Sequence, residues 1–182
     1  NRSSVPDDFA YDWSSMESYM QRLDRQGAAL NVVPVVGHGT VRQNVLGYES
    51  RKPSEAELES MKQLLMEAME EGAWGMSTGL IYPPSAYGKQ PEITELAKVL
   101  AGYDGIYFSH IRNEGEELLE AVTEACEIGK NGGTSVQIAH FKAKGKPYWG
   151  RTSESLELVE KYRDTGVEAT FDQYPYVASS TN

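Results

Sequence analysis

The sequence predicts an α/β protein that forms part of a (β/α)8 barrel, with about five parallel strands and flanking helices. Three observations carry this prediction. Amphipathic helical segments alternate with short apolar runs five times, and repeated strand and helix units of this kind form a parallel sheet. Most helical segments end near a glycine, which is a common helix stop. His110 and His140 end two successive apolar runs, and polar residues gathered at strand ends are typical of barrel enzymes.

The helices are located by capping residues, apolar spacing and terminal glycines. Ser14 with Glu17 and Ser54 with Glu57 have the spacing of capping boxes, and Thr152 suits the cap of the last helix. Between these signals, apolar residues recur every three or four positions, which places them on one helix face. The expected helices cover about residues 14–27, 54–72, 91–101, 116–128 and 152–166.

Short apolar runs between the helices are the expected strands. They cover residues 31–36, 73–80, 105–111, 135–141 and 167–172. Phe108, Ile138 and Phe171 are expected to face the barrel interior. A complete barrel needs eight strands and about 250 residues, so five strands in 182 residues also suit an open doubly wound sheet. The histidines at the strand ends favour the barrel.

Composition and charge disfavour several classes of protein. Seventeen Lys and Arg against 27 Asp and Glu give a net charge of −10, which repels nucleic acid and anionic membrane surfaces. The longest apolar stretch, residues 32–36, is far shorter than the ~20 residues of a membrane span. The only cysteine, Cys126, lies mid-helix as a buried thiol and favours a reducing, cytoplasmic location. Because the chain opens at Asn1 without a methionine or a targeting signal, residues 1–182 are expected to be one segment of a larger domain.

His110 and His140 are candidate metal ligands. Equivalent positions on neighbouring parallel strands lie ~5 Å apart, which lets two imidazoles share a metal ion. Two ligands do not complete a zinc site, and two strand-end histidines that only hydrogen-bond to their neighbours would have the same spacing. His38, between Gly37 and Gly39, is better interpreted as packing than as a ligand. A dinucleotide loop is not expected there, because the third glycine is missing and no helix is expected to follow directly.

Four segments resemble the D-aminoacylase (N-acyl-D-amino-acid deacylase) family of the amidohydrolase superfamily. In order they are residues 79–84 (GLIYPP), 109–115 (SHIRNEG), 137–142 (QIAHFK) and 172–181 (DQYPYVASST). The likeness runs nearly end to end and includes residues 31–42. Several independent motifs in register make a chance likeness improbable.

The resemblance implies a zinc-dependent hydrolase on a (β/α)8 barrel with a small accessory β-domain, of which this chain would hold strands three to seven. It also implies that His110 and His140 bind the metal. By similar position, the groups that receive the substrate's carboxylate and amide would be Tyr82, Lys142, Tyr174 and Ser180. The family's first-strand His-x-His pair, its cysteine ligand and its general-base aspartate have no counterpart in this sequence, so no catalytic acid or base is assigned within it.

The implied reaction of the full-length protein is hydrolysis of an N-acyl-D-amino acid to a carboxylate and a D-amino acid. Two alternatives are another amidohydrolase, such as a cyclic-amide hydrolase, and a non-catalytic folding or assembly unit. The isolated chain is expected to be inactive and to hold zinc weakly or not at all. It is also expected to self-associate through unpaired strand edges at residues 31–36 and 167–172.

Overall fold

The structure, a computed structural model, describes residues 11–179 and contains one five-stranded sheet. All four strand pairs are parallel, and the strands lie in sequence order from β1 to β5. The strands are β1 (Val36–Gly37), β2 (Gly75–Gly79), β3 (Ile106–His110), β4 (Ser135–Ile138) and β5 (Ala169–Phe171). The α-helices are α1 (Met16–Gln26), α2 (His38–Leu46), α3 (Glu55–Glu70), α4 (Gln90–Ala101), α5 (Leu118–Gly132) and α6 (Thr152–Asp164). Two 3-10 turns, η1 (Ser85–Tyr87) and η2 (Lys146–Tyr148), lie in the loops after β2 and β4.

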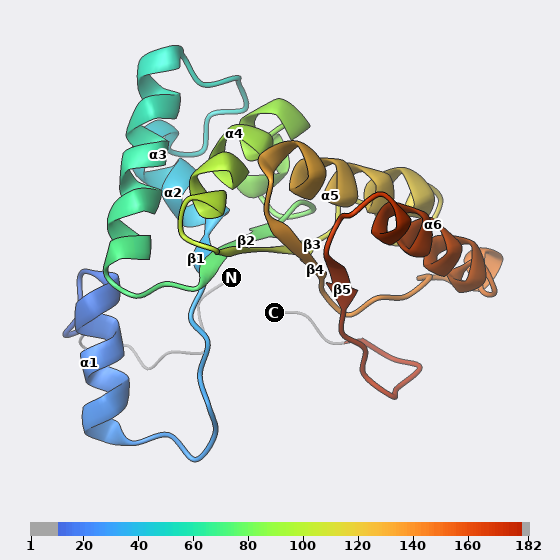
Figure 1. Ribbon diagram of the computed structural model, residues 1–182, viewed down its shortest axis with the longest axis horizontal. Helices are drawn as coiled ribbons and strands as arrows, with labels where there is room; N and C mark the ends of the chain where they lie inside the picture. Colours follow the sequence, from blue (N-terminus) through green and yellow to red (C-terminus); the bar gives the residue numbers. More distant parts are fainter. Residues whose placement is uncertain (1–10, 180–182) are drawn as a thin grey trace.

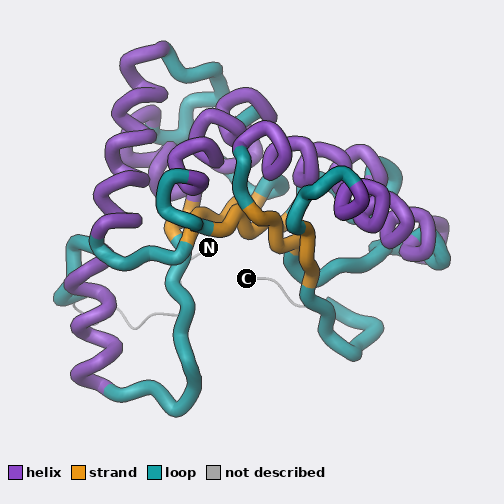
Figure 2. The backbone as a smooth tube through the Cα atoms, in the orientation of Figure 1, coloured by secondary structure: helices purple, strands orange, loops and turns teal. Residues whose placement is uncertain are grey.

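The arrangement of the helices distinguishes a barrel segment from a doubly wound sheet. Helices α2 to α6 form a layer along one side of the strands (Figures 1 and 2). A doubly wound sheet has helices on both faces and a reversal in strand order, and the described residues show neither. The partial (β/α)8 barrel predicted from the sequence is therefore confirmed, and the open sheet is not.

The core fills the space between the sheet and the helix layer. On this face the register aligns Met76, Tyr107, Val136 and Ala169, all nearly inaccessible to solvent. Helix α5 adds Cys126, a fully buried thiol whose pKa is raised to about 12 by burial. The expectation of a buried rather than nucleophilic cysteine is confirmed.

Side-chain caps define the starts of two helices, α1 and α3. The box at Ser54 and Glu57 is confirmed, because the Ser54 backbone N–H donates to the Glu57 carboxylate at 2.7 Å and the Glu57 N–H donates back to Ser54 Oγ. The first box was misplaced by one residue. Ser15, in extended conformation, caps α1 and pairs with Ser18 instead of Ser14 pairing with Glu17. Thr152 is the first residue of α6 rather than its cap.

Residues 31–36 do not form the buried strand that was predicted. Only Val36 and Gly37 pair with β2, while Val32 and Val33 are 44% and 56% exposed. An apolar run by itself does not distinguish a buried strand from an extended edge segment, and Pro34 lacks the N–H that a strand ladder needs.

Two further expectations were wrong. Helix α2 begins directly at His38, although no helix was expected after the Gly-x-Gly turn. Ile138 and Phe171 share a face with Ser109 on the helix side of the sheet, whereas Phe108 pairs with Gln137 on the opposite, open face. The reason is the register between β3 and β4, which a strand's alternation alone does not reveal.

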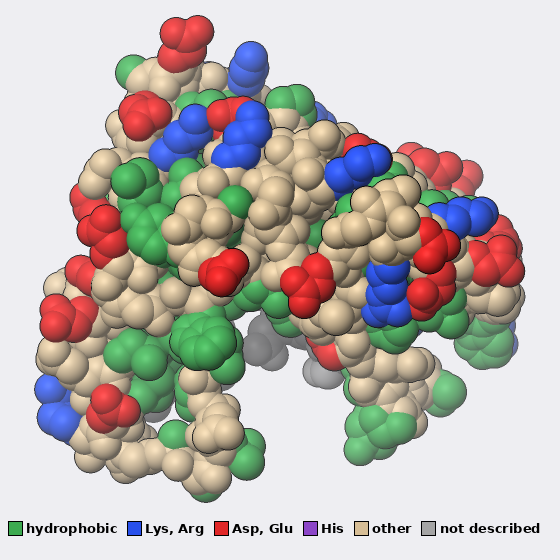
Figure 3. All heavy atoms as spheres, viewed as in Figure 1, with side chains coloured by type: hydrophobic (Ala, Val, Ile, Leu, Met, Phe, Trp, Pro, Cys, Tyr) green, Lys and Arg blue, Asp and Glu red, His purple; other side chains and the backbone are tan. Residues whose placement is uncertain are grey.

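The surface shown in Figure 3 mixes charges of both signs. Acidic side chains are spread over the helix layer with Lys and Arg among them. None of the helices in the described part of the chain has the length and apolar character needed to span a membrane.

Candidate functional site

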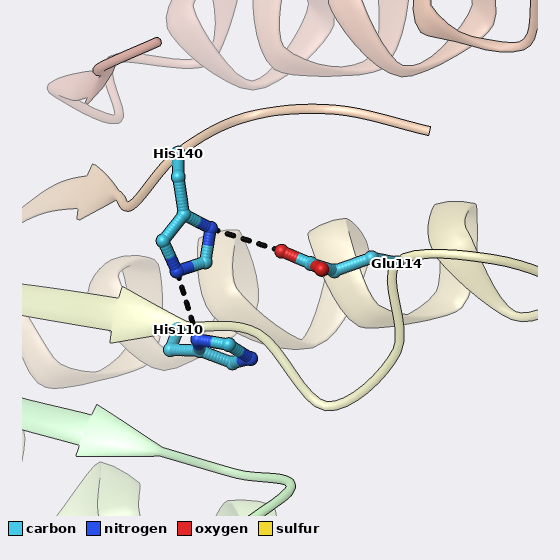
Figure 4. Close-up of side chains that lie close together, drawn as sticks. All are labelled: His110, Glu114 and His140. Carbon is cyan, nitrogen blue, oxygen red and sulfur yellow. Dashed lines mark hydrogen bonds and ion pairs between the residues drawn. The ribbon is translucent and has the colours of Figure 1, made fainter. Parts of the chain in front are cut away.

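The two predicted histidines meet at the carboxyl ends of β3 and β4. His110 is the last residue of β3, and His140 follows β4 by two residues. The atoms His110 Nδ1 and His140 Nε2 are 2.8 Å apart, and the two rings are nearly perpendicular with centroids 4.4 Å apart (Figure 4). The two imidazoles meet as predicted, but not from equivalent positions: the register pairs Ser109 with Ile138, so His140 lies one residue beyond the level of His110, in a turn after β4.

Glu114 completes the cluster. It lies in the loop after β3, its side chain is only 7% exposed, and its Oε1 is 2.9 Å from His140 Nδ1 (Figure 4). Sequence reasoning did not select it, although it belongs to the 109–115 segment that carries the family resemblance. Its place depends on the fold of the loop, where the Glu114 carbonyl accepts the backbone N–H of Lys144 at 2.6 Å.

The chemistry of this cluster fits a zinc ion. One ligand atom each from His110, Glu114 and His140 lie within 4.8 Å of one another, and imidazole nitrogen and carboxylate oxygen are common zinc donors. His110 Nε2 is buried and has no hydrogen-bond partner within the described residues. Burial, with the His140 imidazole beside it, lowers the pKa of His110, which favours the neutral form that a metal ligand needs.

The backbone at His140 has an unusual conformation. Its φ is +38°, a region that non-glycine residues seldom occupy. The turn is held by Asp172, which follows β5 and accepts the His140 backbone N–H through Oδ1 at 2.7 Å. The same aspartate accepts the amide of Gln137 through Oδ2 at 3.0 Å. Asp172 therefore supports the position of one imidazole without contacting the ring.

Three of the four predicted substrate groups lie around the histidines. Lys142 Nζ is 2.5 Å from Glu114 Oε1, donates to the His140 carbonyl at 3.0 Å, and lies 5.5 Å from the centre of the Tyr174 ring. The Tyr82 ring centre is 5.2 Å from that of His110. The fourth predicted group, Ser180, lies outside the described residues.

These side chains line a small pocket at the carboxyl ends of the strands. Its volume is about 140 Å³. A second pocket of about 420 Å³ shares Lys142 and Tyr174 with it and is also lined by Lys144 and Lys146. The long loops after β2 and β4 supply residues to this face. Cations are thus concentrated locally in a chain whose net charge is −10.

His38 does not join this cluster. It is fully buried, and its ring nitrogens face Ser85 Oγ at 2.8 Å and Glu92 Oε1 at 3.0 Å. The interpretation of His38 as a packed, hydrogen-bonded residue is confirmed.

Comparisons with known proteins agree with this geometry. D-aminoacylase of Alcaligenes xylosoxydans xylosoxydans is 38% identical to the chain over 172 residues, which are 94% of this chain and 35% of that protein. The crystal structure of N-acyl-D-glutamate deacylase from Bordetella bronchiseptica, complexed with zinc and a phosphonate inhibitor, superposes with a TM-score of 0.84 at 36% identity. It covers 89% of this chain and 34% of that one. Over nearly its whole length, the chain is homologous to these deacylases.

A second solved structure is similar to the chain over the same span. It is a D-aminoacylase described as defining a novel subset of amidohydrolases, and it superposes with a TM-score of 0.84 at 35% identity over 90% of this chain and 34% of that chain. The chain thus spans about a third of the length of the D-aminoacylase relatives it matches. No family model matches the sequence.

Proposed function

We propose that the full-length protein is a zinc-dependent N-acyl-D-amino-acid deacylase, which hydrolyses its substrate to a carboxylate and a free D-amino acid. One observation carries the proposal: the imidazoles of His110 and His140 and the Glu114 carboxylate lie beside the Lys142 ammonium in a single pocket. The similarity to enzymes named D-aminoacylase and N-acyl-D-glutamate deacylase supports it. In this proposal residues 1–182 form the central part of one barrel domain.

His110 and His140 would hold the metal. Both imidazoles are rigidly placed, the first by its strand and the second by Asp172. Zinc, when bound, polarises a carbonyl group and lowers the pKa of a water molecule, so that hydroxide is available near neutral pH. The contact between Glu114 and His140 Nδ1 orients the His140 ring, as carboxylates commonly do for metal-binding histidines.

Lys142 would receive the substrate carboxylate, with Tyr174 and Ser180 beside it. An ammonium group that is 22% exposed and already faces a buried carboxylate is strongly ordered, and charge-assisted contacts to it are among the stronger hydrogen bonds. Tyr82, next to His110, would bind the acyl group or its carbonyl. The general base is assigned to a part of the full-length enzyme other than the described residues, because Glu114 is engaged by Lys142 and His140.

The substrate is a small molecule, and no role for nucleic acid is proposed. Location in the cytoplasm is part of the proposal and is supported by the single, buried Cys126, whose thiol has no partner for an internal disulfide.

Assays of the full-length protein test the proposal directly. Turnover of N-acetyl-D-methionine, with little turnover of the L-isomer or of a cyclic amide, is expected, together with stoichiometric zinc. A His110→Ala variant should lose zinc and turnover, whereas Lys161→Ala, on the exposed face of α6, should retain both. Turnover of the cyclic amide alone would favour the other amidohydrolase branch, and a folded protein with neither zinc nor turnover would favour the non-catalytic alternative.

A further inference from the structure

A buried polar network outside the metal cluster reaches the loop that follows β2. Arg42 and Glu92 form an ion pair at 2.6 Å in which both side chains are almost inaccessible to solvent. Glu92 also faces His38 Nε2 at 3.0 Å, and His38 Nδ1 faces Ser85 Oγ at 2.8 Å. The contacts therefore join α2, through Arg42 and His38, both to α4 and to the 3-10 turn η1 in the loop after β2.

Burying this network costs free energy that apolar packing would avoid. Taking an ion pair out of water carries a desolvation penalty that its attraction does not always offset. Arg42 Nη2 donates to two backbone carbonyls, those of Glu49 at 3.2 Å and Arg51 at 2.5 Å, while the buried Arg42 Nε has no hydrogen-bond partner within the described residues. Such networks fix one geometry rather than add much stability, which raises the question of which segment this one fixes.

The segment is the loop of residues 80–89. Ser85 Oγ also accepts the backbone N–H of Gly79 at 3.4 Å, which ties the turn to the end of β2. Gly88 packs so closely on the imidazole that a Cβ atom there would lie 2.6 Å from His38 Cε1. The histidine thus contacts the loop at two points, through a hydrogen bond and through direct packing.

The other side of the same loop is held by Arg112. Its guanidinium donates to the carbonyls of Ala86 at 3.1 Å and Gly88 at 2.8 Å. A bidentate pair with Glu124 of α5, at 2.9 Å for both contacts, fixes that guanidinium. Arg112 follows His110 by two residues, so the loop is joined to the strand end that carries a candidate metal ligand.

Between these two supports the loop presents Tyr82 to the pocket. The Tyr82 backbone N–H donates to Gly79 at 2.9 Å, and its carbonyl accepts the N–H of Ala86 at 2.9 Å. The ring lies against His110 and lines the 140 Å³ pocket. The position of Tyr82 therefore depends on how the turn that follows it is held.

We infer that Arg42, Glu92, His38 and Ser85, with Arg112 on the opposite side, are positioning residues that clamp residues 80–89 and so set the place of Tyr82 over His110. The inference rests on the proposed function for its effect on catalysis. Its structural part, the holding of the loop, is independent of that function.

Hydrogen exchange in the full-length protein tests the structural part without any substrate. Ser85→Ala removes the hydrogen bond to His38, and Gly88→Ala introduces a Cβ that the ring has to avoid. In both variants the amides of residues 80–89 should exchange at least about tenfold faster while those of β3 do not change, because local opening exposes only the released segment. Lys62→Ala is the control, since its ion pair with Glu95 also joins α4 to a neighbouring helix but does not contact the loop. Unchanged exchange in the loop for both variants overturns the clamp.

Kinetics test whether the clamp acts through Tyr82. Displacing a substrate-binding group by about 1 Å lowers catalysis by up to ~100-fold, so Ser85→Ala should reduce kcat/KM on N-acetyl-D-methionine by roughly 10- to 100-fold with zinc content unchanged. In a Tyr82→Ala background the same change should cost less than about twofold, because contacts that act as a unit are not additive. Equal losses in both backgrounds would show that Ser85 does not act through Tyr82. If the enzyme does not hydrolyse the substrate at all, the proposed function fails, while the exchange result still decides the clamp.

Discussion

Replacing Lys142 by alanine tests the site most sharply, because this lysine has two roles that different substrates separate. Its ammonium pairs with Glu114, whose side chain is 7% exposed, and it is the proposed partner of the substrate carboxylate. Truncating one member of a desolvated charge pair costs about 2 to 4 kcal/mol. At about 1.4 kcal/mol for each tenfold change in rate, kcat/KM on an N-acetyl-D-amino acid should fall roughly 30- to 1000-fold.

The assay compares two substrates in the full-length enzyme. N-acetyl-D-methionine carries the free carboxylate, and N-acetyl-D-methioninamide has the same shape without the charge. If Lys142 binds the carboxylate, Lys142→Ala should lower kcat/KM strongly for the acid and by no more than about threefold for the amide. Lys161→Ala is the matched control, and zinc content should be equal in all three proteins. A loss of the same size on both substrates would show that Lys142 only supports Glu114, and a loss below about twofold on the acid would place it at the solvated rim.

Further predictions concern charge, pH and assembly. Lys144→Ala should lower kcat/KM more for N-acetyl-D-glutamate than for N-acetyl-D-methionine, because Lys144 lines both adjoining pockets; equal losses would exclude a role in side-chain recognition. Burial alone would raise the pKa of Glu92, but His38 and Arg42 together lower it, so its contribution to stability is complete above about pH 4.5 and is lost as the pH falls below that value. Urea unfolding of the parent and of Glu92→Gln measures how much free energy of unfolding the substitution removes. This loss should be smaller at pH 4 than at pH 7, and an equal loss at both pH values would contradict the assignment. Sedimentation equilibrium of the isolated chain at micromolar concentration should give a dimer or larger species, because β1 and β5 each lack a second strand partner in the described structure; a cooperative monomer would be the contrary result. Dialysed against zinc, the isolated chain should retain it weakly or not at all, which metal analysis measures.

The fold was predictable wherever local signals agree with one another. Ser54 and Glu57 mark the start of α3 because the cap and its partner are both present, and apolar spacing then continues for the length of the helix. Helix α2 was missed because it is short, contains Gly39 and the β-branched Thr40 and Val41, and lacks a side-chain cap. Residues 31–35 were misassigned because an apolar run does not reveal whether any segment covers it.

The site was predictable only in the part that the strands position. His110 and His140 could be brought together from sequence because the carboxyl ends of neighbouring parallel strands lie side by side, although the register places His140 one residue beyond the level of His110. Glu114 could not, since its carboxylate reaches His140 through a loop whose path depends on contacts such as the bond between its carbonyl and Lys144. The side of the sheet to which Ile138 points was also hidden, because it depends on a one-residue offset between β3 and β4.

The left-handed backbone of His140 has a consequence for how this position can evolve. At φ +38°, glycine or asparagine would relax the turn more readily than most side chains do. Replacing His140 by glycine or asparagine would therefore be neutral or favourable for the backbone of the turn, although it removes the imidazole. Selection on stability alone would therefore give histidine no advantage over glycine or asparagine for the backbone of this turn. Libraries screened for thermal stability should accordingly enrich glycine or asparagine at position 140, and libraries screened for turnover should return histidine.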